Sequence, residues 1–455
     1  MSARAPTRGR GPRVEDGGAG GAYAARYRGF AGRRLALVES MLHGAFYDGI
    51  HEARGFGLRV WVLLREHGWY AADEDWAGHP LTRTDRLSYV DTHDADAVVA
   101  AISDDRGQPL VDGVTTFSDY HTEVAAEAAR RLGLPGPGVR PVATANHKHL
   151  LREALGASPY NLPHVLVTGA GQLPDAARRL GFPMVAKPPS EAISHGVRLV
   201  EDAAALRRAY AELSAVRHSL RGQPRPGHVL LERYVDAPEV SVESLTIDGT
   251  TYFYGPTAKE LRPPPTFLES AHSFPARLDR DQWHAVKAAV GEALDTIGYR
   301  QGPCHTEVKL TPGGPRIVEV NPRLPAGGIT EMVRDVCGQS PHLDAKLLAV
   351  GERPRPPGGE RRGGAAVVVL YPPQGAGVLE AVEGVEAAAA VPGVRVTLLA
   401  RPGDHLWHRL DNSGRVGFVY ARGPDAATAL ATAHRAAALV TVRVKPEEPQ
   451  PEAAP

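Results

Sequence analysis

Two short segments with alternating polar and apolar residues, HTEVKL (305–310) and RIVEVN (316–321), constrain the local structure most strongly. A period of two is typical of β-strands, because successive side chains of a strand point to opposite faces. The intervening TPGGP (311–315) is rich in turn-forming residues. The sequence therefore predicts an antiparallel hairpin. The side chains expected to share a face are His305, Glu307 and Lys309 on the first strand, and Ile317, Glu319 and Asn321 on the second.

If the loop spans 311–315, the residues opposite each other are Leu310 with Arg316, Glu307 with Glu319, and His305 with Asn321. Two opposed carboxylates repel each other and destabilise a hairpin, whereas a divalent cation between them reverses the sign of the interaction. Asn321 adds an oxygen ligand, and an all-oxygen site with room for phosphate suits Mg²⁺ or Mn²⁺. The alternative is a solvated hairpin face with exposed charges. Arg323 follows at the position where it can meet a phosphate or acyl phosphate oxygen.

Lysine is scarce in this chain, which has 7 Lys against 45 Arg. A lysine that remains is expected for its own chemistry, a compact point charge on a flexible stem. Lys148 begins a predicted helix, and Lys187 ends an apolar strand and precedes a loop with Ser190, Ser194 and Gly196. Small loop residues allow backbone N–H groups to approach phosphates. The Walker A motif is absent. The alternative places both lysines on the surface.

The N-terminal third contains a tail and a first folded layer. Residues 1–32 are rich in Gly, Arg and Ala without periodicity, which predicts a disordered tail. Residues 33–142 alternate between strand-like and helix-like segments, which predicts a small parallel α/β layer. Its expected strands are 35–40, 59–66, 96–102 and 113–119.

The remaining chain divides at segments rich in Pro and Gly. The expected units are 143–350 with a break near 221–227, a linker over 351–364, a small α/β unit over 365–445, and a tail over 446–455. In the last unit, residues 379–390 are expected to form a helix.

Taken in chain order, several segments together resemble the ATP-grasp superfamily, and most closely its L-amino-acid ligase branch among the carboxylate–amine ligases. They are the Lys148 helix start, PMVAKPP…SHGV (183–197), LLERYVDAPEVSVES (230–244), AKELRPPPTFLESAHSFPA (258–276), HTEVKL and VEVNPRLPAGGI (318–329). The resemblance covers about residues 33–445. It implies an α/β and α+β chain: an ATP-grasp fold, preceded by a small parallel α/β (pre-ATP-grasp) domain and followed by a small C-terminal α/β domain.

The resemblance also implies a role for each matching residue. Lys148 and Lys187 would hold the nucleotide phosphates, with Ser194 and Gly196 in the covering loop; Glu232 to Val235 would read adenine through the backbone; and Glu239 would bind the ribose hydroxyls. Glu307, Glu319 and Asn321 would be the magnesium ligands; Arg323 and Lys187 would stabilise the transferred phosphoryl group; Gly327 and Gly328 would bind a carboxylate or acyl phosphate; and Glu269 and His272 would lie on the acceptor side.

Two features depart from the family's pattern. The phosphate-covering loop has Ile193 where Gly is expected and His195 where the ligase branch often has Arg. The segment PRLPAGGI lacks the Asp that often follows the Gly-Gly pair in L-amino-acid ligases. We therefore expect a stiffer or differently gated loop, and the identity of the bound amino acid stays open.

The resemblance implies an enzyme that uses ATP and Mg²⁺ (or Mn²⁺) to activate a carboxylate as an acyl phosphate and join it to an amine. The expected product is a dipeptide or an amino-acid amide, with ADP and phosphate released. The alternatives are an ATP-grasp carboxylase or purine-pathway-type ligase, and a non-catalytic ATP-binding regulatory module.

Charge and cysteine content restrict the partners. Lys plus Arg equals Asp plus Glu, at 52 each, which argues against a dedicated nucleic-acid or membrane-surface binder. The expected partners are small-molecule carboxylate and amine substrates, amino acids by resemblance, and a homodimer is left open. Two cysteines do not make a disulfide framework. Together with the absence of a long apolar run or signal segment, this predicts a cytoplasmic enzyme.

Overall fold

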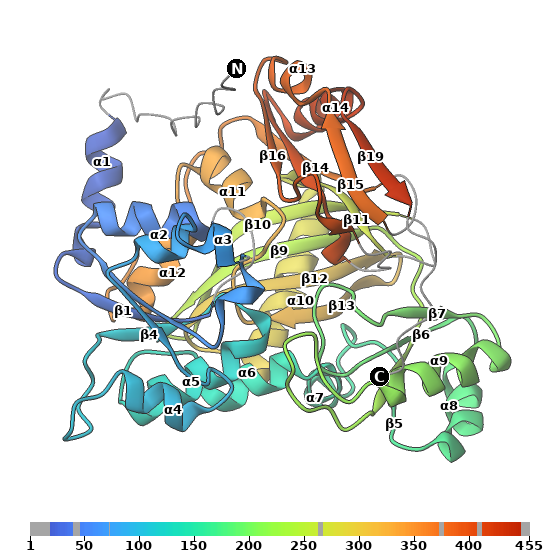
Figure 1. Ribbon diagram of the computed structural model, residues 1–455. Helices are drawn as coiled ribbons and strands as arrows, with labels where there is room; N and C mark the ends of the chain where they lie inside the picture. Colours follow the sequence, from blue (N-terminus) through green and yellow to red (C-terminus); the bar gives the residue numbers. More distant parts are fainter. Residues whose placement is uncertain are drawn as a thin grey trace.

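The computed structural model describes residues 19–39, 46–71, 73–262, 267–372, 377–406 and 412–446. Near the N-terminus, four strands form a parallel sheet in the order β3-β2-β1-β4 (Figure 1). The strands are β1 (Arg34–Val38), β2 (Arg59–Leu64), β3 (Arg86–Tyr89) and β4 (Gly113–Thr115); the helices are α2 (Phe46–Gly55), α3 (Asp73–Trp76), α4 (Ala95–Ala101) and α5 (Thr122–Arg131). Buried side chains cover both faces of this sheet, which confirms the predicted parallel layer.

Two expectations for this region are wrong. Residues 96–101 belong to helix α4 and not to a strand, and the strand missed by the pattern is β3. Asp94 caps α4 by accepting a hydrogen bond from the backbone N–H of Asp96. Val98 and Ile102, four residues apart, are its buried positions, a helical spacing that a short apolar run conceals.

The predicted disordered tail over 1–32 is also wrong in part. Residues Ala19–Arg26 form helix α1, and a 3₁₀ turn follows over Arg28–Phe30. The side chains of Tyr27 and Phe30 are fully buried in the core beneath the parallel sheet. Burial of two aromatic side chains offsets the ordering entropy of a segment rich in Gly and Ala. Residues 1–18 lie outside the described part of the chain.

A second, antiparallel sheet forms the small lobe, defined here as residues 164–233 (lower right in Figure 1). Its strands are β5 (His164–Val167), β6 (Met184–Lys187), β7 (Arg198–Val200) and β8 (Val229–Arg233), in the order β5-β8-β6-β7, with helices α8 (Leu173–Leu180) and α9 (Ala203–Ala215). Helices α6 (Val139–Asn146) and α7 (Lys148–Leu155) precede it.

The third sheet, the large sheet, has eight strands in the order β13-β12-β9-β10-β11-β14-β18-β16. They are β9 (Glu239–Ile247), β10 (Thr250–Leu261), β11 (Glu269–Phe274), β12 (Gly302–Thr311), β13 (Gly314–Asn321), β14 (Gly364–Leu370), β16 (Val394–Leu398) and β18 (Gly417–Gly423). Strand β11 pairs with β14, so the C-terminal strands continue the same sheet. Helices α10 (Arg280–Ile297), α11 (Ile329–Cys337), α12 (Pro341–Ala349) and α14 (Ala426–Ala437) pack against this framework.

The last sheet is small, with the order β17-β15-β19. It consists of β15 (Gly377–Glu383), β17 (His405–Leu406) and β19 (Thr441–Pro446). The helix expected over 379–390 is therefore wrong in its first half: residues 379–383 belong to β15, and only Val385–Ala389 is helical, as α13. Gly384 separates the two at a φ of 77°, and a Cβ there would lie 1.8 Å from the carbonyl oxygen of Leu439. A helix cannot continue through that contact.

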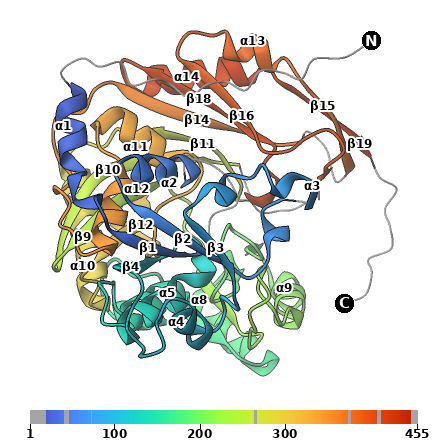
Figure 2. The ribbon, with the colours of Figure 1, turned by 60° about the vertical axis from the view of Figure 1, so that its left-hand side comes forward.

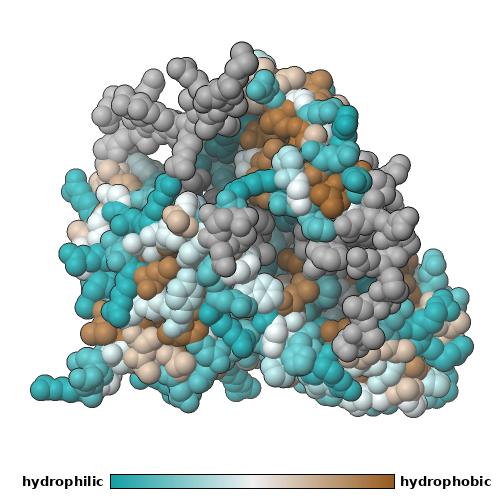
Figure 3. Space-filling view, viewed as in Figure 1, coloured by the Kyte–Doolittle hydropathy of each residue, from teal (hydrophilic) through white to brown (hydrophobic). Residues whose placement is uncertain are grey.

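The outer surface has one asymmetric feature. Figure 3 shows apolar residues gathered at the top of the viewed face, over the C-terminal strands, while hydrophilic residues dominate the rest. Figure 2 shows these strands (red) at the top of the molecule and the small lobe (green) below them. No helix in the described ranges is long and apolar enough to cross a membrane.

Candidate active site

One cavity lies where the small lobe, the large sheet and the C-terminal strands meet. Including its opening to solvent, it encloses about 1270 Å³. Of the predicted site residues, those lining it are Lys148, Lys187, Ser194, Glu232, Val235, Glu239, Glu269, Glu307, Glu319 and Arg323. Asn321, Gly196, His272, Gly327 and Gly328 lie next to these residues in the chain or by contact and are not among the lining residues.

The hairpin of β12 and β13 places two carboxylates opposite each other, as the sequence predicts. Glu307 is the partner of Glu319, and His305 is the partner of Asn321. The loop, however, is shorter than expected: Leu310 pairs with Pro315 and not with Arg316. A β-bulge at Val318 inserts one residue and restores the pairing of the acids.

The bulge corrects a second expectation. Ile317 does not share a face with Glu319, because it pairs with Val308 and lies fully buried in the core beneath the sheet. Val318 takes its place and lines the cavity. Its carbonyl oxygen accepts a hydrogen bond of 2.6 Å from Arg152 Nη2. The bulged residue therefore supplies a hydrogen-bond acceptor for the buried guanidinium of Arg152.

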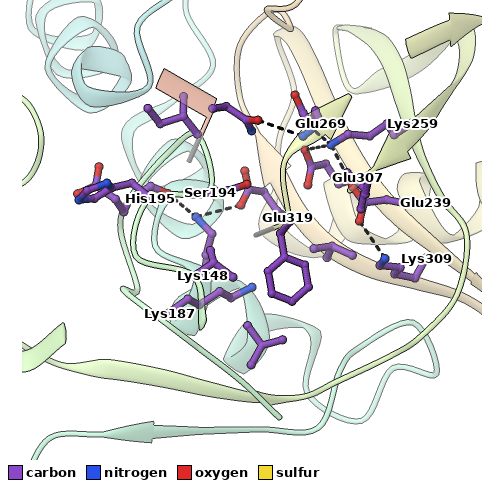
Figure 4. Close-up of a pocket in the computed structure, with 18 of the residues that line it drawn as sticks. Lys148, Lys187, Ser194, His195, Glu239, Lys259, Glu269, Glu307, Lys309 and Glu319 are labelled. Atoms are coloured by element: carbon purple, nitrogen blue, oxygen red, sulfur yellow. Dashed lines mark hydrogen bonds and ion pairs between the residues drawn. The ribbon is translucent and has the colours of Figure 1, made fainter. Parts of the chain in front are cut away.

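Two buried lysines approach the acids from the small lobe and its entrance (Figure 4). Lys148 Nζ lies 3.0 Å from Glu319 Oε2 and donates to the carbonyl oxygen of Glu191 at 2.7 Å. Lys187 Nζ lies 2.6 Å from Glu232 Oε2. Burial lowers the pKa of Lys187, although Glu232 opposes this. Both lysines thus line the cavity, and each forms an ion pair with a carboxylate.

Glu232 is held by two cations at once. Its Oε1 accepts a 2.6 Å hydrogen bond from Arg152 Nε, and its Oε2 pairs with Lys187. Although burial opposes ionisation, Arg152 and Lys187 together lower the pKa of Glu232 to about 2. The Glu232 side chain is therefore held by these two ion pairs, while the rest of 232–235 also lines the cavity.

Lys259 on β10 is a central residue that the site prediction left out. Its Nζ lies 3.0 Å from Glu239, 2.7 Å from Glu269 and 2.6 Å from Glu307 (Figure 4). Despite burial, these acids hold the pKa of Lys259 well above its usual range. Two signals in the sequence pointed to it: the scarcity of lysine, and its place in the segment over 258–276 that resembles the ligase branch.

Glu239 forms a second ion pair, because Lys309 Nζ lies 3.3 Å from its Oε2. His305 Nδ1 lies 2.9 Å from Glu243 Oε2. Burial opposes protonation of this ring, but Glu243 and Glu307 raise the pKa of His305 to about 9. The acids of the hairpin therefore face lysines and a protonated imidazole.

The loop over 190–197, here called the phosphate loop, has an unusual backbone. Ile193 and Ser194 adopt φ angles of 54° and 60°, and Gly196 adopts 75°. A β-branched residue in this region is strained. The carbonyl oxygen of Ile193 accepts a 3.1 Å hydrogen bond from the backbone N–H of Asn412. The C-terminal part of the chain thus supports the strained turn.

The acceptor-side residues form a compact group. Glu269 Oε2 lies 2.5 Å from Arg415 Nη2 and 3.4 Å from His272 Nε2. His272 Nδ1 lies 3.2 Å from the carbonyl oxygen of Gly327. Gly327 and its neighbour Gly328 have φ angles of 69° and 78° and precede helix α11. A Cβ on Gly327 would lie 2.8 Å from His272 Cε1, so the turn requires glycine.

Arg323 is held from the N-terminal layer. Its Nε pairs with Asp119, and its Nη1 donates to the carbonyl oxygen of Leu324 at 3.0 Å. Burial opposes the charge, but Asp119 raises the pKa of Arg323. Asp119, Asn412 and Arg415 were missed by sequence reasoning, because each lies in a segment without a motif and reaches the site only through the fold.

The donor set fits a hard divalent cation. Glu307 and Glu319 are opposed carboxylates, and Asn321 beside them is a buried amide whose Nδ2 has no hydrogen-bond partner. Within the described ranges, no group of three or more His, Cys, Asp and Glu side chains is arranged to hold a metal. A cation here would rely on two carboxylates, one amide and the oxygens of a substrate, which is the usual pattern for Mg²⁺.

Comparisons with protein families match three separate stretches of the chain. Residues 50–136 match the ATP-grasp N-terminal domain, residues 180–331 match the ATP-grasp domain, and residues 369–445 match the L-amino acid ligase C-terminal domain 2. Together these stretches make up more than half of the chain.

Individual proteins agree with the family matches. Carnosine synthase 1 of Gallus gallus is 29% identical over 320 residues, covering 66% of this chain and 33% of that protein. Alanine–anticapsin ligase of Bacillus amyloliquefaciens is 28% identical over 249 residues, covering 50% of this chain and 52% of that protein. The chain thus spans a third to a half of these relatives.

Among solved structures, the L-amino acid ligase of Bacillus licheniformis superposes with a TM-score of 0.75 at 23% identity. The superposition covers 91% of this chain and all of that one. At this identity the likeness establishes the fold, and it confirms the ATP-grasp architecture with a preceding α/β domain and a C-terminal domain.

Proposed function

Because the chain belongs to the ATP-grasp superfamily, with amino-acid ligases among its relatives, we propose that it is an ADP-forming ligase that joins a carboxylate to an amine. The substrates are proposed to be amino acids and the product a dipeptide or an amino-acid amide. The supporting observation is the hairpin register: Glu307 lies opposite Glu319 in a cavity that Lys148 and Lys187 enter from the other side.

The proposed reaction has two steps. The terminal phosphoryl group of ATP moves to a carboxylate oxygen, which gives an acyl phosphate and ADP. The amine nitrogen then attacks the acyl carbon and the bond from that carbon to the phosphate oxygen breaks. Inorganic phosphate leaves with one oxygen of the carboxylate, and the protons of the ammonium group pass to phosphate and solvent.

The residues take the following proposed roles. Lys148, Lys187 and the phosphate loop, with Ser194 and Gly196, hold the phosphates; the backbone of 232–235 and the Glu239 carboxylate hold adenosine. Arg323 balances charge on the transferred group, and the N–H groups at the Gly327–Gly328 turn bind the activated carboxylate. Glu269 and His272 serve the amine substrate.

Glu307, Glu319 and Asn321 are the proposed ligands of Mg²⁺ or Mn²⁺. When bound, such a cation supplies charge neutralisation for the phosphates. Lys148 and Lys259 pair with these acids, which removes the repulsion between opposed carboxylates. A cation and a nucleotide together would take over that balance, which would free Lys148 for phosphate oxygens and leave Lys259 paired with Glu269.

The deciding experiment is a substrate panel. Purified protein with ATP and Mg²⁺ is given single amino acids and pairs, with bicarbonate and formate as further arms. ADP, AMP and products are measured, the products by mass spectrometry. ADP release with a product one water lighter than its two substrates supports the proposal. AMP release contradicts it, product with bicarbonate or formate favours the carboxylase or purine-pathway type, and nucleotide binding without any turnover favours a regulatory module.

The compartment is also proposed. Cys304 and Cys337 are both free thiols, and burial raises the pKa of Cys304 to about 12. Unpaired cysteines suit a reducing compartment, so we propose a cytoplasmic location. A homodimer remains open to measurement by light scattering.

A further inference from the structure

The segment over 412–415, which precedes strand β18, supplies two residues of the cavity wall. Asn412 and Arg415 both line it. The backbone N–H of Asn412 donates to Ile193 of the phosphate loop, and its Oδ1 accepts from the backbone N–H of Glu269 at 3.1 Å and from Tyr371 Oη at 3.0 Å. The segment is therefore anchored to both walls of the site, and a side chain that it carries has a defined position.

Arg415 carries a buried guanidinium at the end of this segment. Its side chain is 12% exposed. Nη2 pairs with Glu269 at 2.5 Å, and Nε lies 3.5 Å from Tyr371 Oη. The hydrogen bonds of Arg415 to described residues come from Nε and Nη2, and a Cβ placed on Gly327 would lie 3.6 Å from Nη1. The Nη1 donor thus lies near the turn proposed to bind the activated carboxylate, where the amine substrate has to approach.

The charges around Arg415 point to an anion. Lys259 pairs with Glu239, Glu269 and Glu307. If Glu307 binds the cation and Glu239 the ribose, as the proposed function requires, Lys259 and Arg415 share the single carboxylate of Glu269. The pocket then holds a surplus positive charge, and a desolvated cation is costly without a counter-ion. The guanidinium fork matches a carboxylate in shape.

The position of Arg415 indicates which of the two substrate carboxylates it would bind. Lys259 links Glu307 to Glu269, and Arg415 lies beyond Glu269, three ion pairs away from the proposed metal ligand Glu307. The carboxylate that receives the phosphoryl group must lie near Glu307, Glu319 and Arg323. A carboxylate at Arg415 is therefore on the far side of the attacking nitrogen and takes no part in the chemistry.

We propose that Arg415 is a specificity-determining residue that binds the carboxylate retained by the amine substrate. This inference rests on the proposed ligase function and deepens it: the acceptor is an amino acid, not a simple amine, and the product is a peptide with a free carboxylate. Asn412 positions the segment that carries Arg415.

The test compares each acceptor amino acid that reacts in the panel with its own carboxamide, such as L-alanine with L-alaninamide. Arg415→Met keeps the stem and removes the charge, and Arg415→Lys keeps the charge without the fork. Arg262→Met is the matched control, because the exposed Arg262 lies over the Tyr371 ring, 4.8 Å from its centroid, and does not line the cavity. Acyl phosphate formed from the donor alone is trapped with hydroxylamine as the hydroxamate.

We expect the wild type to prefer the acid over the carboxamide by about 10- to 100-fold in kcat/KM, the value of one charged hydrogen-bonding contact. Arg415→Met should lose this preference through a fall with the acid only, Arg415→Lys should regain part of it, and Arg262→Met should match the wild type. Hydroxamate formation should be equal in all four proteins.

Three results overturn the inference. An equal fall of Arg415→Met with acid and carboxamide would mean that Arg415 only positions Glu269. Loss of hydroxamate in Arg415→Met alone would mean that it serves the donor carboxylate. Absence of hydroxamate from the wild type with every carboxylate would refute the proposed function itself, and the inference with it.

Discussion

At the residue scale, opposed carboxylates are tolerated here because each has its own cation. Glu319 pairs with Lys148, and Glu307 with Lys259. Burial alone would raise the pKa of Glu307, but Lys259 and His305 hold it well below its usual range. Both acids are thus ionised and available, which a pair of buried carboxylates without lysines would not be.

Glu319→Gln tests the proposed cation site. The amide still accepts a hydrogen bond from Lys148 but loses the charge that a cation requires, so product formation should fall by about 100-fold or more with an unchanged circular dichroism spectrum. Glu260→Gln is the control, since Glu260 neighbours Lys259 on β10 but pairs with the exposed His434. An unchanged rate for Glu319→Gln would refute the assignment of Glu319 as a cation ligand.

Lys346 gives a prediction on pH. It is fully buried on α12, and burial lowers its pKa to about 7 although Glu52 opposes this. Between pH 7 and about 10.5 only the unfolded chain is protonated at this group, so each pH unit adds about 1.4 kcal/mol to the free energy of unfolding. Below pH 7 both states are protonated and the full cost of the buried charge is present.

Lys346→Met should therefore be more stable than the wild type by up to about 4 kcal/mol near pH 7, with a gap that closes as the pH approaches 10. Urea unfolding at several pH values measures it. Lys445→Met changes an exposed lysine, so its free energy of unfolding should equal that of the wild type at every pH. A gap that does not vary with pH would mean that the buried amine stays charged.

At the element scale, helix α1 and its 3₁₀ turn act as a clamp on the N-terminal layer. Tyr27 Oη accepts a 3.1 Å hydrogen bond from the backbone N–H of Ser340, which caps α12. The Tyr27 and Phe30 rings are stacked with centroids 6.2 Å apart. A segment of low complexity thus joins two elements that are more than 300 residues distant in the chain.

Phe30→Ala should destabilise the protein by about 3–5 kcal/mol, because it opens a cavity in a core that has no free space. The free energy of unfolding from urea titration measures this. Arg28→Ala, at the exposed position between the two aromatic residues, should change it by no more than about 0.5 kcal/mol. Equal effects of the two substitutions would show that the turn is not part of the core.

The hairpin shows why register needs more than periodicity. The prediction assumed too long a loop and did not foresee the bulge at Val318, and these two errors shift the register in opposite directions. They cancel at Glu307 and Glu319, which pair as predicted. They do not cancel at Ile317, which does not share the face of these acids. The bulge follows from Arg152, whose guanidinium needs the carbonyl oxygen of Val318. That need arises from helix α7 and cannot be read from the hairpin.

At the scale of the whole molecule, the site is assembled from every layer. Asp119 of the N-terminal layer holds Arg323, the small lobe brings Lys187, and the C-terminal strands bring Asn412 and Arg415. The pairing of β11 with β14 makes this possible, because it fuses the C-terminal strands to the large sheet. Residues hundreds of positions apart are thereby fixed relative to each other.

Asn412→Ala should loosen the phosphate loop. The substitution removes the two hydrogen bonds that anchor the side chain, each worth about 1 kcal/mol, and so weakens support for Ile193. Hydrogen exchange over 190–197 should accelerate about tenfold, and the KM for ATP should rise. Thr397→Ala, at an exposed position on β16, is the control. Unchanged hydrogen exchange in Asn412→Ala would show that the conformation of the phosphate loop does not depend on Asn412.

The sequence by itself determined the parallel N-terminal layer, the acids and lysines of the site, and the family, because these depend on local periodicity and on the order of motifs along the chain. Only the tertiary structure decided that α1 docks, that Lys259 is shared by three carboxylates, and that Asp119 and Arg415 reach the cavity. The physical reason is that burial and ion pairing depend on which segments meet in space. A lone Asp or Arg without a motif looks the same at the surface and at the site until the sheets bring its partner to it.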